Sequence, residues 1–108
     1  MNIGQIAKMA QQMQTQMAQA QDELKQTTLE ATAGGGDVRI VITGAQEVRS
    51  VEIDPSAVDP DEVEMLQDLV MTAINEAIRR SKELERERMS GIAGGMGLPG
   101  MPGLPGFG

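Results

Sequence analysis

The sequence has no cysteine, no histidine, no tryptophan and no tyrosine, and its one aromatic residue is Phe107. Without cysteine there are no disulfides and no cysteine metal sites. Histidine is the usual general base and the commonest metal ligand, so its absence removes most enzyme chemistries. The body of the chain also offers no aromatic ring for stacking on single-stranded bases. We therefore expect a protein that is not an enzyme and that holds no metal and no cofactor.

Long apolar runs are missing as well. Residues 1–14 contain Lys8 and many glutamines, unlike the basic start and unbroken apolar stretch of a signal peptide. No stretch approaches the roughly 18 apolar residues that a membrane-spanning helix needs. We expect a cytoplasmic protein with no membrane partner.

The 108 residues carry a formal net charge of −7, which opposes simple binding to nucleic-acid phosphates. The excess of acids is uneven along the chain. Residues 1–27 are neutral overall, residues 28–58 carry two bases against five acids, and residues 59–89 carry five bases against nine acids. The remaining residues are uncharged. The position of each base therefore matters more than the total charge.

The apolar residues of segment 3–27 predict one long helix. They recur at alternating steps of three and four residues, the heptad spacing of a helix that packs on a partner. Two of these positions are alanine and two are flexible methionine, which indicates a weak docking face and not a tight zipper. The positions of this seam are Ile3, Ile6, Ala10, Met13, Met17, Ala20, Leu24 and Thr27.

A period of two replaces the helical spacing and predicts three strands. Residues 29–33 alternate between apolar and polar side chains, and three glycines at 34–36 break the run. Residues 38–43 alternate again, residues 44–46 form a turn, and residues 48–53 make the third run. Strand runs joined by such turns are typical of an antiparallel three-stranded meander.

The segment Asp59-Pro60-Asp61-Glu62 predicts the start of a second helix, with Asp59 as its N-cap and Pro60 at its first position. We expect this helix to run to about Met89 and to stop at Ser90-Gly91.

The rest of the chain, residues 91–108, differs in kind. It contains three Gly-x-Pro triplets, far too few for a collagen triple helix. We expect a disordered tail here, or else a short peptide motif for an unknown protein partner. The chain is thus divided into one folded domain, residues 1–90, and the tail.

The second helix is too long for the sheet. About thirty helical residues span roughly 45 Å, whereas strands of six residues span roughly 20 Å. Small domains with few large side chains are also marginally stable. We therefore expect a homodimer in which two chains complete one core. Its candidate core residues are Ile40, Ile42, Val51, Ile53, Leu66, Val70, Ala73 and Ala77.

Three bases of the second helix, Arg79, Lys82 and Arg86, fall on one narrow stripe that faces away from its apolar positions. This basic stripe is the first candidate for contact with DNA phosphates. A second interpretation stays open, because bases near a helix C-terminus complement the helix dipole and Arg79 has Glu83 at i+4. Further candidates for DNA contact are Lys8, Lys25, Arg39 and Arg49.

Several stretches are distinctive as sequence: Val38-Arg-Ile-Val-Ile-Thr-Gly44, Val51-Glu-Ile-Asp-Pro55, Met65-Leu-Gln-Asp-Leu69 and Ala73-Ile-Asn-Glu-Ala77. With the Met/Gln-rich start and the Gly/Pro/Met-rich end, they make essentially the whole chain resemble the YbaB/EbfC family. The resemblance implies an α+β fold, an α-β-β-β-α subunit with a three-stranded antiparallel sheet between two long helices. It also implies an intertwined, tweezer-like homodimer.

The function that the resemblance implies is that of a nucleoid-associated protein. Such a homodimer binds double-stranded DNA with little sequence preference and alters DNA conformation and gene expression. Two alternatives remain. The chain is a protein-interaction adaptor beside replication or repair enzymes, using the first helix and the tail, or it is a structural dimer without direct DNA binding.

Overall fold

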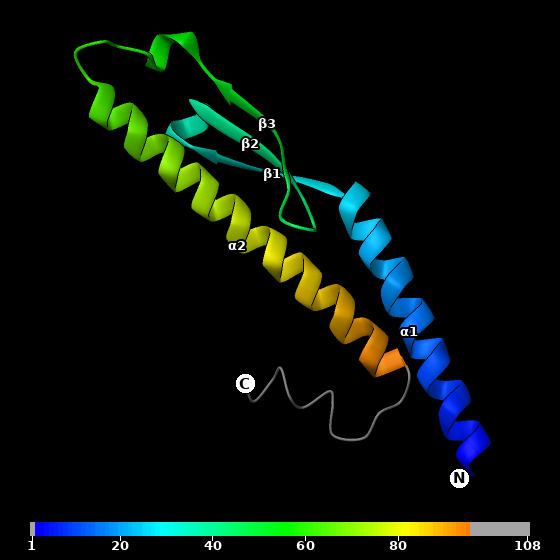
Figure 1. The fold of residues 1–108 in the computed structure, drawn as a ribbon. Helices are drawn as coiled ribbons and strands as arrows, with labels where there is room; N and C mark the ends of the chain where they lie inside the picture. Colours follow the sequence, from blue (N-terminus) through cyan, green and yellow to red (C-terminus); the bar gives the residue numbers. More distant parts are fainter. Residues whose placement is uncertain (1, 96–108) are drawn as a thin grey trace, which may run out of the picture.

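A computed structural model describes residues 2–95 and shows, within them, two helices and three strands (Figure 1). The elements are α1 (Ile3–Gln26), β1 (Thr28–Ala33), β2 (Val38–Thr43), β3 (Val48–Ile53) and α2 (Val63–Gly95). Short 3-10 turns follow β1 and β3. The expected α-β-β-β-α order is confirmed, as is the antiparallel sheet.

The sheet has the order β1-β2-β3, and both neighbouring pairs are antiparallel. The β1–β2 hairpin turns through three glycines with positive φ angles: Gly34 at 65°, Gly35 at 68° and Gly36 at 103°. Residues with a Cβ rarely adopt this left-handed backbone, so the glycine run is what permits the turn. The β2–β3 ladder carries an irregularity between Val41 and Ile42.

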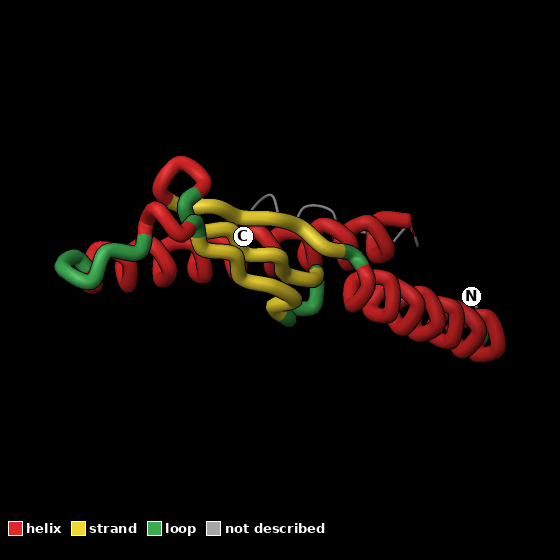
Figure 2. The backbone as a smooth tube through the Cα atoms, turned by 90° about the horizontal axis from the view of Figure 1, so that it is seen from above, coloured by secondary structure: helices red, strands yellow, loops and turns green. Residues whose placement is uncertain are grey.

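One face of the sheet packs on α2, which lies behind the sheet in Figure 2. The buried core combines Ala31, Ala33, Val38, Ile40 and Ile42 of β1 and β2 with Ala73 and Ala77 of α2. The two helix alanines have no side chain beyond Cβ, so the helix backbone can lie close to the sheet. Every residue of β3, by contrast, remains exposed.

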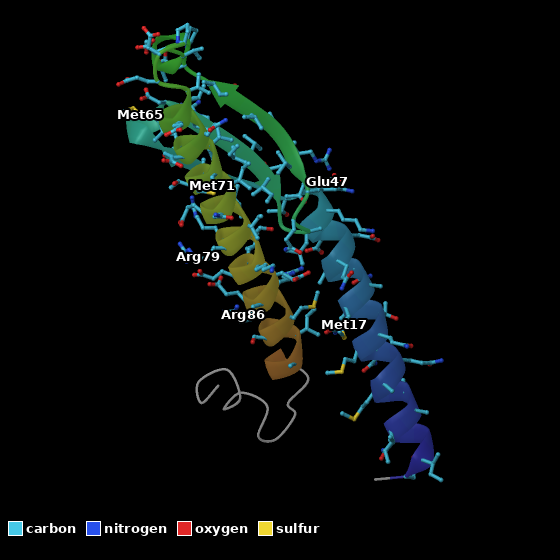
Figure 3. The ribbon with its side chains drawn as sticks, turned by 60° about the vertical axis from the view of Figure 1, so that its left-hand side comes forward. Met17, Glu47, Met65, Met71, Arg79 and Arg86 are labelled. Atoms are coloured by element: carbon cyan, nitrogen blue, oxygen red, sulfur yellow. The ribbon has the colours of Figure 1, made fainter. Side chains whose placement is uncertain are left out.

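Both helices extend well beyond the sheet. The molecule measures 69 × 28 × 16 Å, and α1 runs beside the C-terminal part of α2 and then past its end (Figures 1 and 3). This confirms the expectation that the second helix is too long for the sheet. Among residues 2–95, no helix is long and apolar enough to cross a membrane.

The turn between β2 and β3 joins the two helices to the sheet. The Gly44 N–H donates to the carbonyls of Leu24 and Thr27 at the end of α1, both at 2.9 Å. The hydroxyl of Ser81 on α2, fully buried, donates to the Thr43 carbonyl at 2.6 Å. It also accepts hydrogen bonds from the Gln46 backbone N–H at 3.2 Å and from Gln46 Nε2 at 3.0 Å. One turn thereby fixes α1, the sheet and α2 relative to one another.

The predicted start of the second helix is wrong, because α2 begins at Val63. The Asp59 carboxylate accepts a hydrogen bond from the Asp61 N–H, and the Asp59 carbonyl accepts one from the Glu62 N–H, both at 2.9 Å. Aspartate offers the backbone such a turn as an alternative to helix. Asp59 therefore closes a separate turn ahead of the helix, and Pro60 lies in that turn.

The predicted stop at Ser90-Gly91 is also wrong, because α2 continues to Gly95. Ile92 is half-buried and lies beside Gln16 and Gln19 of α1. Glycine costs about 1 kcal/mol inside a helix, and packing against a neighbouring helix can offset that cost. The rest of the expected tail, residues 96–108, lies outside the described residues.

We predict that Ser81→Ala lowers the free energy of unfolding by about 1–3 kcal/mol, because the Thr43 carbonyl loses the 2.6 Å hydrogen bond from the buried hydroxyl, and the Gln46 N–H and Nε2 each lose one of their acceptors. Urea denaturation followed by circular dichroism measures this change. Ser50→Ala on the exposed strand β3 is the control and is expected to change the free energy by less than about 0.5 kcal/mol. Equal effects of the two substitutions would show that the buried hydroxyl has no special role.

Candidate nucleic-acid interface

The structure places Arg79, Lys82 and Arg86 on one exposed face of α2, as the helical spacing predicts. Ala73, Ala77 and Ser81 are buried on the opposite side of the same helix. Figure 3 shows Arg79 and Arg86 on the side of α2 that points away from α1. The stripe is therefore open to a partner as large as a DNA duplex.

Arg79 is the member of the stripe whose charge is most compensated. Its guanidinium holds the Glu76 carboxylate through two hydrogen bonds, at 2.6 and 3.2 Å, and the Glu83 carboxylate at 3.0 Å. The hydrogen bond from Arg79 lowers the pKa of Glu76, and the same contact raises the pKa of Arg79. Glu76 therefore stays ionised at neutral pH and is protonated only in acid.

Lys82 and Arg86 have no such compensation. Within residues 2–95, neither makes an ion pair, and both side chains are exposed. The dipole and ion-pair interpretation of the stripe thus applies to Arg79, whereas Lys82 and Arg86 present free cationic groups.

The other candidate bases do not join this stripe. Arg39 lies on the sheet face away from α2, between Glu30 at 3.6 Å and Glu52 at 3.7 Å. Arg49 pairs with Glu47 at 3.4 Å and donates to the Lys25 carbonyl at 3.0 Å.

Lys8 and Lys25 are exposed on α1. Lys8 lies in the second turn of α1, near its N-terminus, and Lys25 lies in the last turn of α1, shortly before β1 begins. In the described part of the chain, neither lysine makes an ion pair. They lie on a different helix from the basic stripe and do not belong to it.

Two further arginines of α2 have structural contacts that the sequence could not reveal. Arg88 pairs with Glu23 of α1, and Arg80 donates to the Glu30 carbonyl of β1. Both contacts join residues that are far apart in the sequence, so no local spacing predicts them. They hold α2 against α1 and against the sheet edge.

The acids gather at the end of the molecule where α2 begins. No lysine or arginine occurs between Arg49 and Arg79 in the sequence. The hydrogen bond from the Ser56 N–H lowers the pKa of Asp54, which keeps that carboxylate ionised. Among residues 2–95, no three acidic side chains converge on a possible metal site. This acidic end repels phosphates, so the part of the molecule open to DNA is the other end. The acids here are Asp54, Asp59, Asp61, Glu62, Glu64 and Asp68.

The candidate dimer-core residues divide into two sets. Ile40, Ile42, Ala73 and Ala77 are fully buried inside a single chain and belong to the subunit's own core. The other four are partly open: Val51, Ile53, Leu66 and Val70.

The open residues lie in one region. Val51 and Ile53 of β3 pair with Ile40 and Val38, so they share the sheet face on which α2 packs, yet α2 does not cover them. A shallow apolar groove on α2 is lined by Leu66, Val70, Met71 and Ile74 together with Gln67 and Asn75. We call this region, β3 together with the groove, the α2–β3 surface. Met71 is 56% exposed and Val51 49% exposed, high values for large apolar side chains.

Comparison with known proteins gives a consistent result over almost the whole chain. Residues 1–96 match the model of the YbaB/EbfC DNA-binding family. A protein of Acetivibrio thermocellus named nucleoid-associated protein is 50% identical over 96 residues, covering 89% of this chain and 85% of its own. A protein of Chloroflexus aurantiacus with the same name is 51% identical over 96 residues, covering 89% of this chain and 96% of its own.

A crystal structure of an uncharacterised Helicobacter pylori protein has the same fold, with a TM-score of 0.71. It is 24% identical in sequence, and the match covers 81% of this chain and 91% of that protein.

The carboxylates of Glu76 and Glu83 already hold the guanidinium of Arg79. We therefore predict that these two residues weaken DNA binding. We expect Glu76→Gln combined with Glu83→Gln to raise DNA affinity and to steepen the dependence of log K on log salt by about 0.9 for each subunit that gains a phosphate contact. Filter binding on a random duplex at several salt concentrations measures both quantities. The control is Asp61→Asn with Glu64→Gln, which makes the same change in net charge at the acidic end. Equal gains in both variants would mean that only net charge matters.

Proposed function

Because the chain belongs to the YbaB/EbfC DNA-binding family, we propose that it is a nucleoid-associated protein that binds double-stranded DNA as a homodimer. Binding has little sequence preference, and it alters the conformation of the DNA and thereby gene expression. The protein acts in the nucleoid and catalyses no reaction. The exposed stripe of Arg79, Lys82 and Arg86 is the observation that carries this proposal.

The chemistry of the stripe fits phosphates better than base edges. Lysine and arginine on an exposed helix face neutralise phosphates, which positions a protein on a duplex and carries no sequence information. Two such stripes, one on each subunit of a dimer, double the number of phosphate contacts. Held at a fixed separation, they favour those DNA conformations in which both stripes touch the backbone.

The homodimer is supported by the α2–β3 surface. A folded monomer leaves Val51, Ile53 and Met71 in water, although each would stabilise the protein if it were buried. Most soluble homodimers have a two-fold axis, so the same patch on both subunits covers itself. Such an arrangement joins the two chains away from the far end of α1 and leaves the helical arms free to receive DNA.

The basic stripe generates the main test of DNA contact. We predict that replacing Arg79, Lys82 and Arg86 by glutamine flattens the slope of log K against log salt by several units, at about 0.9 for each lost phosphate contact. Filter binding measures the slope, while circular dichroism and sedimentation confirm unchanged helicity and dimerisation. Arg39→Gln is the control, because the charge of Arg39 is already compensated by Glu30 and Glu52. A triple variant that binds like the parent protein would place the contacts elsewhere, with Lys8, Lys25 and Arg49 next to be tested.

The α2–β3 surface generates a prediction about mass. Sedimentation equilibrium at low micromolar concentration should report at least the dimer mass of about 23 kDa, twice the 11.5 kDa of one chain. Val51→Asp combined with Met71→Asp should reduce it, because two carboxylates cannot be buried in an apolar interface without a large cost. Val58→Asp, also exposed but outside the α2–β3 surface, is the control and should leave the mass unchanged. A folded monomer of the parent chain would contradict the dimer.

A further inference from the structure

The exposed half of α1 carries apolar side chains that belong neither to the basic stripe nor to the α2–β3 surface. Only Ala20 and Leu24 of this helix are buried, and both lie near its C-terminal end. Towards the N-terminus, the seam is open: Ile3 is 85% exposed, Ile6 53% and Met17 41%. Figure 3 shows α1 running on past the end of α2, with Met17 on the part of α1 that lies beside the last turns of α2.

The heptad spacing of this seam is the pattern of a helix that packs on another helix. A helix that needed only to project into water would gain nothing from isoleucines and methionines on one line. The open part of the seam, Ile6, Ala10, Met13 and Met17, therefore indicates a helical partner. Of these four residues Met13 is half-buried and the other three are exposed.

Charge narrows the choice of partner. Between residues 3 and 21 the only charged side chain is Lys8, and glutamines fill most of the positions around the seam. One lysine is too little to select an acidic partner or a DNA backbone. A second copy of this chain carries the same net charge of −7, so an uncharged segment such as this one is a place where two copies can meet without charge repulsion between the facing side chains.

The seam is also complementary to itself. If two copies of α1 run antiparallel, the register that sets Ile6 against Met17 also sets Ala10 against Met13. Each small alanine then meets a long methionine, whose flexible side chain adapts to the space. The same layers occur twice about the two-fold axis of the pair.

We propose that the open part of α1 pairs antiparallel with the same segment of another molecule and so links one dimer to the next. The α2–β3 surface and the open part of α1 lie far apart on an elongated subunit. Two separate surfaces that each bind their own copy generate an open chain of subunits. Dimers linked in this way bring their DNA-binding arms together and can hold two duplexes side by side. That each linked unit is a dimer rests on the proposed function, whereas the pairing of α1 does not.

Cysteine cross-linking tests the register directly, because the chain has no cysteine of its own. One preparation carries Ala10→Cys and the other Met13→Cys, and the two are mixed and oxidised. The proposal predicts a disulfide-linked pair of about 23 kDa, twice 11.5 kDa, on a non-reducing gel. A mixture of Gln11→Cys and Thr15→Cys, on the far side of the helix, should give at least five-fold less. Equal cross-linking of both mixtures, or none in either, overturns the proposal.

Mass measurements on the full chain test the link between dimers. As concentration rises from about 1 to 200 µM, the mass should climb from about 23 kDa through about 46 kDa, four times 11.5 kDa, and beyond, because an open chain of dimers has no fixed size. Ile6→Gln with Met17→Gln should hold it at 23 kDa and leave binding to one duplex unchanged, whereas Gln11→Ala with Thr15→Ala should behave like the parent. If the parent chain does not bind a single duplex, the proposed function is contradicted, but the pairing of α1 is not.

Two results would identify other occupants of the seam and overturn the proposal. If the mass rises only after residues 96–108 are deleted, the chain's own C-terminal segment covers the seam. If the mass stays at 23 kDa at 200 µM with or without that segment, the seam is kept for a different protein.

Discussion

The position of every functional surface depends on the turn between β2 and β3. The Gly44 N–H is shared between two carbonyls at the end of α1, and Leu24 packs so closely that a Cβ on Gly44 would lie 2.6 Å from Leu24 Cδ2. From the other side, Ser81 anchors α2 to the same turn. Each helix is fixed near the middle of the molecule. A small change in the geometry of this turn would therefore move the far ends of the helices by a larger distance. These few hydrogen bonds, together with the ion pair between Arg88 and Glu23, set the direction of α1 relative to α2.

The incomplete cover of the sheet follows from the same geometry. The alanines of α2 bring the helix close to β1 and β2, and a single helix cannot also span β3. Val51 and Ile53 are left open, which costs stability in the monomer and supplies the apolar area that a partner subunit can bury. The weakness of the subunit core and the proposed dimerisation therefore have one cause.

The sequence predicted the element order, the sheet and the basic stripe because each rests on a local period. Alternation at Val38, Ile40 and Ile42 correctly identified the buried face of β2. The predicted start and end of α2 were wrong because other contacts compete with the local pattern. Asp59 forms a separate turn, and packing on α1 allows α2 to continue past Gly91. Half of the expected dimer-core residues, Ile40, Ile42, Ala73 and Ala77, are already buried within one subunit, because residue type cannot tell an interface from an interior. No local spacing in the sequence predicts the ion pair between Arg88 and Glu23.

Charge is sorted along the molecule in a way that reconciles DNA binding with a net charge of −7. Acids at the start of α2 lie far from the basic stripe, and at physiological ionic strength exposed charges more than about 8 Å apart are largely screened. Close to the stripe, Glu76 and Glu83 still offset Arg79. Because each subunit has few free cationic side chains, one subunit binds DNA weakly. Occupancy of the DNA therefore depends on several subunits that bind the same stretch. A second association surface on α1 would therefore strengthen DNA binding without adding a single base to the stripe, because linked dimers bind together.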